Sequence, residues 1–198
     1  MSKASRKSRE DILKLAVPLF AKSGYDGVSI RNVASQSQLT PAALYYHFKD
    51  KEALYFETVK HAFETKTTAA KELVENTDAA IANLEVFITW FVATLDKEND
   101  FQKLLQWVLL DSNTQRMQIL VKDVFADLFI TTRKLAESFS PAYDPYMLSI
   151  SIIGLVLCHF QSQQGRQYLP GNKAIHDKPR VISAHIIKLL KNGLPSSY

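Results

Sequence analysis

The chain has 198 residues, of which 46% are apolar and 22% charged, and its formal net charge is +4. This composition is ordinary for a globular protein and excludes disorder over most of the chain. The single cysteine, Cys158, excludes an internal disulfide, and the N-terminus MSKASRKSRE lacks the apolar core of a secretory signal, so we expect a cytoplasmic protein. The longest uncharged run, residues 145–165, is polar in its second half, and we expect no membrane span.

The excess positive charge lies at the N-terminus. Residues 1–54 contain nine lysines and arginines against five acidic residues, which accounts for the whole net charge. A basic module joined to a neutral body is typical of a protein that binds a polyanion. The simpler alternative is a basic tail, residues 1–7, that only aids solubility.

Apolar residues recur at spacings of three and four, and no segment alternates for long with the period of a strand. This pattern predicts an all-α protein. The first predicted helix covers residues 8–22, where Pro18 removes one backbone hydrogen bond and should introduce a bend. Gly24 should end this helix in the left-handed conformation.

Two short helices are predicted next. Ser29 caps the first, over residues 30–37, and Thr40 with Pro41 begins the second after a brief turn. The second helix has only two residues to bury, four apart, and the rest of its side chains are polar, aromatic or small. Two short helices joined in this way have the dimensions of a helix-turn-helix. We therefore expect a DNA-binding domain over residues 1–50 and a second domain over 51–198.

The body is predicted to contain further helices over residues 51–75, 78–96, 100–112, 114–139, 145–164 and 180–192. The helix over 145–164 is apolar all round between Tyr146 and Phe160, which indicates two buried sides and therefore a partner. We expect a two-fold homodimer in which the last two helices meet their copies. The predicted interface consists of Ile152, Ile153, Val156, Phe160, Ile182, Ile186 and Leu189.

The first quarter of the chain carries a specific run of residues: "LFAKSGYDGVS" followed by "IRNVASQSQLTPAALYYHFKDKEAL". This run resembles the DNA-binding domain of TetR-family transcriptional regulators. The resemblance implies an N-terminal three-helix helix-turn-helix domain and a C-terminal helical ligand-binding and dimerisation domain. It further implies a homodimeric repressor that binds a palindromic operator in double-stranded DNA and is released by a small molecule. One departure is Gln38, where the family usually has glycine in the turn.

The resemblance places Tyr45, His47 and Lys51 at phosphate-contacting positions, and the chemistry agrees, because all three side chains carry donors for phosphate oxygen. Ser29 and Thr40 add hydroxyls at helix N-termini, whose dipoles favour anions. Each of these residues has a simpler structural interpretation when it is considered alone. Their grouping in one basic module favours contact with DNA.

Other residues are expected to contact the bases directly. Pro41 and Ala42 are small enough for close approach to a major groove but cannot hydrogen-bond a base edge. Arg31, in the preceding helix, can donate in a bidentate manner to guanine O6 and N7. Tyr46 is expected to reach sugar, phosphate or a base.

The resemblance also implies a small-molecule pocket among the C-terminal helices, with ligand binding moving the helix over residues 51–75. The aromatic content of the body predicts an apolar or aromatic ligand. The predicted lining is Phe87, Trp90, Phe91, Trp107, Phe125, Phe129 and His159. The alternative is that these side chains only fill the core.

No cofactor and no metal is expected. Two other functions remain open: a ligand-independent DNA-binding protein of chromosome organisation or cell division, and a small helical enzyme. The enzyme would need convergent acid, base or metal-binding groups, and the sequence offers none.

Overall fold

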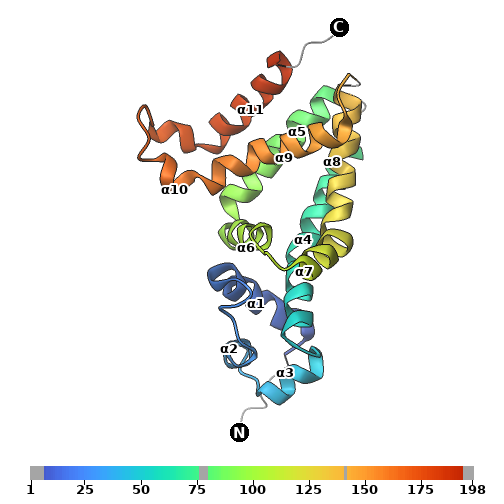
Figure 1. Ribbon diagram of the computed structural model, residues 1–198, viewed down its shortest axis with the longest axis vertical. Coiled ribbons are helices and arrows are strands. Elements are labelled where there is room, and N and C mark those ends of the chain that lie inside the picture. The colour runs from blue at the N-terminus through green and yellow to red at the C-terminus, as the bar shows by residue number, and fades with distance from the viewer. Residues whose placement is uncertain (1–6, 76–79, 141, 194–198) are drawn as a thin grey trace. The chain divides into compact units, whose positions relative to one another are not determined.

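The computed structural model describes residues 7–75, 80–140 and 142–193, and every regular element within them is helical (Figure 1). This confirms the predicted all-α class. The elements are α1 (Arg9–Ser23), α2 (Ile30–Gln36), α3 (Pro41–His47), α4 (Lys51–Glu75), α5 (Ala80–Lys97), α6 (Asn99–Leu109), α7 (Thr114–Leu120), the π-helix η1 (Val121–Phe125), α8 (Ala126–Phe139), α9 (Pro145–Gln161), α10 (Gln163–Arg166), the 3₁₀-helix η2 (Ala174–Asp177) and α11 (Pro179–Gly193). Along this described part of the chain, no helix is both long and apolar enough to cross a membrane.

Most helix ends agree with the sequence, and the differences have local causes. The helix predicted over 114–139 is divided, because η1 widens its middle into a π-turn. α1 continues across Pro18 as one helix. Gly24 has a positive φ of 65° but a ψ of −174°, so it does not adopt the expected left-handed helical conformation. It lies instead in a region open essentially to glycine alone. The start predicted at residue 78 lies outside the described residues.

The chain divides into two compact units, and the division does not fall at residue 50. Unit 1 consists of Met1–Lys66 and Asp100–Phe125, and unit 2 of Thr67–Asn99 and Ala126–Tyr198. The helix-turn-helix therefore shares unit 1 with the first part of α4 and with α6, α7 and η1. Its core is correspondingly larger than a three-helix domain alone would provide.

Unit 1 is held together by aromatic contacts between these two stretches of chain. Phe63 of α4 makes edge contacts with Phe101 and with Phe125, both with ring centroids 4.9 Å apart. Within the first stretch, Phe20 of α1 meets Tyr55 of α4 with ring centroids 5.0 Å apart, and both side chains are almost fully buried. Edge-to-face geometry of this kind is favoured between aromatic rings, beyond the burial of their area.

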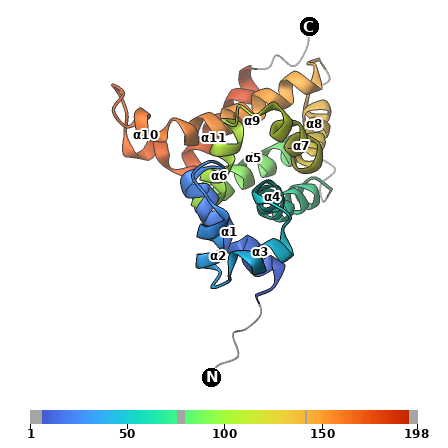
Figure 2. The same ribbon diagram turned by 60° about the horizontal axis from the view of Figure 1, so that its bottom comes forward.

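Unit 2 packs α5 against α8, α9 and α11, and α8 also packs against α9 (Figure 2). The inward face of α5 repeats at helical spacing, with Leu84, Phe87, Ile88, Phe91 and Leu95 all buried. Ion pairs join exposed helix surfaces within the unit, between Lys71 and Asp127 (Nζ to Oδ2, 2.7 Å) and between Lys191 and Glu85. Surface pairs of this kind contribute little to stability.

Candidate nucleic-acid interface

The helix-turn-helix is fixed by its caps and by two anchors on α3. The Thr40 hydroxyl accepts from the Ala43 N–H at 3.1 Å, and Pro41 occupies the first helical position, as expected. Leu44 and Phe48 are buried, at 0% and 2% exposure, and they hold the inner side of the helix. The outer side of α3 is consequently presented to solvent in one orientation.

The cap of α2 is reciprocal. The Ser29 hydroxyl accepts from the Asn32 N–H, and the Asn32 side chain accepts from the Ser29 N–H, both at 3.1 Å. The Ser29 hydroxyl also donates to the Asn32 side chain. The Ser29 hydroxyl must therefore break its bond to the Asn32 side chain before it can donate to a phosphate.

The turn between α2 and α3 contains a strained residue. Gln38 has a φ of 56° and is the only non-glycine residue with positive φ in the part of the chain that the structure describes. The Leu39 N–H donates to the Ala34 carbonyl at 2.8 Å, which closes the turn around it. A residue with a Cβ adopts this conformation at a steric cost.

Gln38→Gly is expected to raise the free energy of unfolding by about 1 kcal/mol, because glycine removes the Cβ clash at positive φ and only part of the gain is lost to a freer unfolded chain. The shift of the urea unfolding midpoint measures it. Gln36→Gly, an exposed change at the end of α2, serves as the control and should destabilise. Equal effects at the two positions would contradict strain at Gln38.

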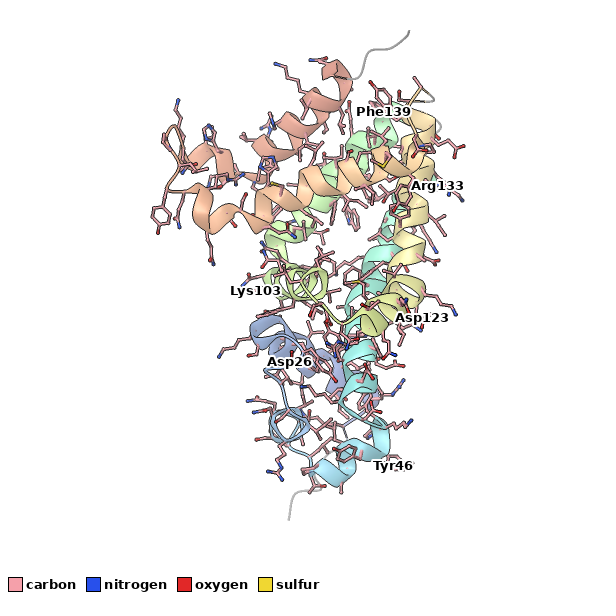
Figure 3. All side chains as sticks on the ribbon, viewed as in Figure 1. Asp26, Tyr46, Lys103, Asp123, Arg133 and Phe139 are labelled. Atoms are coloured by element: carbon pink, nitrogen blue, oxygen red, sulfur yellow. The ribbon has the colours of Figure 1, made fainter. Side chains whose placement is uncertain are left out.

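The structure exposes most of the predicted DNA contacts. Seven of the nine side chains are exposed, and His47 and Lys51 are half-buried. Tyr45 and Tyr46 are 52% and 77% exposed, although large aromatic side chains are usually covered. Figure 3 shows Tyr46 on the outer side of α3. The exposed members are Ser29, Arg31, Thr40, Pro41, Ala42, Tyr45 and Tyr46.

Lys51 makes a contact within the protein that the sequence did not predict. Its Nζ lies 4.2 Å from the centroid of the Tyr25 ring, a cation–π contact. Burial lowers the pKa of this ammonium, although nearby Asp26 acts in the opposite direction. Sequence reasoning missed Tyr25, which was visible only as an aromatic residue between two glycines.

A second charged group reaches the same ring. The Cζ of Arg116, in α7, lies 3.9 Å from the Tyr25 centroid. Arg116 forms a two-bond ion pair with Asp111, through Nε to Oδ2 at 2.6 Å and Nη2 to Oδ1 at 2.9 Å. The hydrogen bonds from Arg116 lower the pKa of Asp111. Nothing local in the sequence predicts this cluster, because Arg116 and Tyr25 are far apart along the chain.

The predicted ligand-pocket residues are not gathered in one unit. Trp107 and Phe125 belong to unit 1, and the other five belong to unit 2. Trp107 lies against Gly24 and donates from Nε1 to the Ala21 carbonyl at 3.1 Å, so it packs on the end of α1. Phe87 and Phe91 are buried, with ring centroids 6.0 Å apart.

His159 is held by a neighbour from the following helix, α10. Its Nδ1 lies 2.5 Å from Arg166 Nη1, and burial followed by the charge of Arg166 lowers its pKa. Two hollows of about 280 and 420 Å³ lie in unit 1 along α7 and η1, and none of the seven predicted pocket residues lines either. The pocket remains a prediction without a described cavity.

The residues predicted for the dimer interface lie mostly on the inner sides of their helices, and the interface stays a prediction. Five of the seven are buried within the chain itself, at 7% exposure or less: Ile152, Val156, Phe160, Ile182 and Ile186. A helix that is apolar all round gives no periodicity from which to tell the inner face from the outer. Leu189, at 45%, is exposed, and Ile153 is half-buried.

These features define a helix-turn-helix protein of the DNA-binding class. Residues 12–58 match the family model for bacterial regulatory proteins of the tetR family. The chain is also 36% identical over 56 residues to IcaR of Staphylococcus aureus (strain Newman), the negative transcriptional regulator of the biofilm operon icaADBC; the match covers 28% of this chain and 30% of IcaR.

The fold of the whole chain is similar to that of solved transcriptional regulators. FadR from Bacillus subtilis, in complex with stearoyl-CoA, matches with a TM-score of 0.77 at 17% identity, covering 92% of this chain and 97% of FadR. AibR, in complex with isovaleryl coenzyme A and operator DNA, matches with a TM-score of 0.72 at 17% identity and the same coverage. The match to the TetR family thus lies in residues 12–58, and the likeness of the remaining chain to these regulators is one of fold.

Proposed function

We propose that this protein is a homodimeric transcriptional repressor that binds a palindromic operator and is released by a small-molecule ligand. The observation that carries the DNA-binding part is the outer side of α2 and α3. There an arginine, two tyrosines and two capped helix starts face solvent, on a segment that holds the excess positive charge. Groups of this kind position a protein on phosphates and present a donor to base edges.

A dimer is supported by the outer face of α9. Met147, Ile150, Gly154 and Cys158 follow one another at helical spacing and are exposed, with Met147 at 61% and Ile150 at 47%. A Cβ placed at Gly154 would meet nothing within 4 Å, so a second backbone has room to approach there. Leu189 of α11 adds an exposed apolar side chain. A two-fold contact between such faces resembles half of a four-helix bundle.

Repression is supported by the resemblance to IcaR, a negative regulator. The ligand class is supported by FadR and AibR, whose structures hold acyl-CoA thioesters. An acyl-CoA combines an apolar chain with a charged carrier, and it is the first class of compound to test. It releases DNA only to the extent that it prefers the conformation that binds DNA poorly.

The test is selection of bound fragments from the source genome, followed by addition of acyl-CoA thioesters of different chain length to the protein–DNA complex. An enriched palindrome and release by one thioester are expected. A complex that no thioester dissociates would favour the ligand-independent alternative. Failure to enrich any sequence would contradict operator binding.

Arg31→Ala is expected to weaken binding to the selected operator by about 1–3 kcal/mol while leaving binding to random DNA nearly unchanged. Lys51→Ala should instead weaken both and flatten the dependence of affinity on salt. Titrations of both duplexes at several salt concentrations separate these roles. Arg133→Ala, at an exposed arginine of α8, is the matched control. Equal losses from Arg31→Ala on both duplexes would contradict base reading.

A further inference from the structure

The Tyr25 ring is shared by two cations that come from different helices. Lys51, at the start of α4, approaches to 4.2 Å from the ring centroid, and Arg116 of α7 approaches to 3.9 Å. Figure 3 marks the neighbouring Asp26 in the turn after α1 that carries this ring. An aromatic face attracts a cation through its quadrupole, so both contacts are favourable although the cations repel each other.

Arg116 is the fixed member of the pair. Its side chain and that of Asp111 are only 11% and 8% exposed. Asp111 Oδ1 also accepts from the Asn113 N–H at 2.9 Å, and the Asn113 side chain accepts from the Arg116 N–H at 2.9 Å. These bonds close residues 111–116 into one unit. A bidentate guanidinium–carboxylate pair restricts both position and orientation.

The ring itself has little freedom. Tyr55 contacts it edge-on at 5.2 Å and is 1% exposed, and Tyr55 is in turn packed edge-on against Phe20. With Tyr55 on one side and Arg116 over the ring, Tyr25 has a defined orientation. The ammonium of Lys51, which ends a flexible side chain, then lies on a ring face whose orientation is fixed by Tyr55 and Arg116.

We propose that Arg116 is a positioning residue for DNA binding, which acts through the Tyr25 ring to hold Lys51 at the start of α4. We call the group Asp111, Arg116, Tyr25 and Lys51 the ring clamp. This inference rests on the proposed function, because it needs Lys51 to contact phosphate. Through the Tyr25 ring, residues 111–116, which are far from α3 in sequence, influence the side chain proposed to contact phosphate.

The clamp is tested with a double-mutant cycle on Arg116→Leu and Lys51→Ala. The probe is a random-sequence duplex of about 30 base pairs at roughly 50 mM salt, because phosphate contacts dominate affinity under these conditions. Lys51→Ala is expected to weaken binding about five-fold, and Arg116→Leu about three-fold. The double variant should bind no more weakly than Lys51→Ala alone. Multiplied losses would overturn the clamp, because they would show that Arg116 acts independently of Lys51.

Removal of Arg116 leaves a buried carboxylate without its partner, and this alone destabilises a fold. The variant Asp111→Asn/Arg116→Leu removes both charges. When it is combined with Lys51→Ala in the same cycle, it must give the same result as Arg116→Leu. Tyr25→Phe keeps the ring and should bind more tightly than Tyr25→Leu, which removes the ring and should behave as Arg116→Leu. A loss in Tyr25→Phe equal to that in Tyr25→Leu would overturn the role of the ring face.

Failure of the clamp and failure of the proposed function give different results. If Lys51→Ala binds the duplex as well as the wild type does, Lys51 does not contact phosphate, and the proposed role of the clamp is refuted as well. If Lys51→Ala is weakened but Arg116→Leu binds normally with an unchanged unfolding midpoint, DNA binding stands and only the clamp is refuted. Arg133→Leu controls for the loss of one positive charge and should change neither quantity.

Discussion

Gly24→Ala is expected to lower the free energy of unfolding by about 3 kcal/mol, which corresponds to a fall in Tm of about 10 °C for a chain of this size. Two costs add. The backbone at Gly24, with φ 65° and ψ −174°, is strained for any residue with a Cβ. The added methyl would also meet the Trp107 ring at 2.8 Å, closer than carbon atoms pack.

Gly171→Ala separates the two costs. Gly171 also has positive φ, at 84°, but a Cβ there would meet nothing within 4 Å. This control should cost only about 1 kcal/mol, through the backbone alone. Thermal unfolding of both variants provides the comparison. Equal losses at the two positions would show that Trp107 does not press on Gly24.

Ile150→Glu is expected to convert the proposed dimer to a monomer and to weaken operator binding about 100-fold, because each half-site is then bound separately. Ile150 is 47% exposed on the outer face of α9. A two-fold contact places the new carboxylate near its own copy, so two like charges lose water together. Sedimentation of the protein alone, followed by titration of the operator, measures both effects.

The matched control is Ile119→Glu. Ile119 is an isoleucine of similar exposure, 40%, in α7 of unit 1. It should leave both the oligomeric state and the affinity unchanged. If Ile150→Glu still sediments as a dimer, the interface lies elsewhere, and the outer face of α9 requires another explanation.

The sequence was sufficient for the parts of the fold that depend on local chemistry. Thr40 and Pro41 begin α3, and Ser29 begins α2, because a cap needs only a side-chain acceptor next to the first free N–H groups. The exposure of Tyr45 and Tyr46 also followed from local pattern, since only Leu44 and Phe48 repeat at the spacing of a buried stripe.

Features that depend on contacts distant in sequence were not predictable. Trp107 was assigned to a ligand pocket, whereas it packs on the end of α1, and no pattern around it indicates that partner. Nothing in the local sequence indicates that the clamp residues Asp111 and Arg116 pair with each other and that Arg116 lies at Tyr25. The inner face of α9 could not be distinguished because Ile152 and Ile150 are equally apolar, yet they are 0% and 47% exposed.

The composition of unit 1 from two separate stretches of chain has a consequence for exchanging DNA specificity between regulators. A graft of residues 1–50 alone would transfer α1 to α3 but leave behind Trp107, which satisfies the Ala21 carbonyl, and Arg116, which lies over the Tyr25 ring. The transplanted helices α1 to α3 would then pack against the recipient's own residues in place of these two. A working chimera needs residues 100–125 of the donor together with its N-terminal helices.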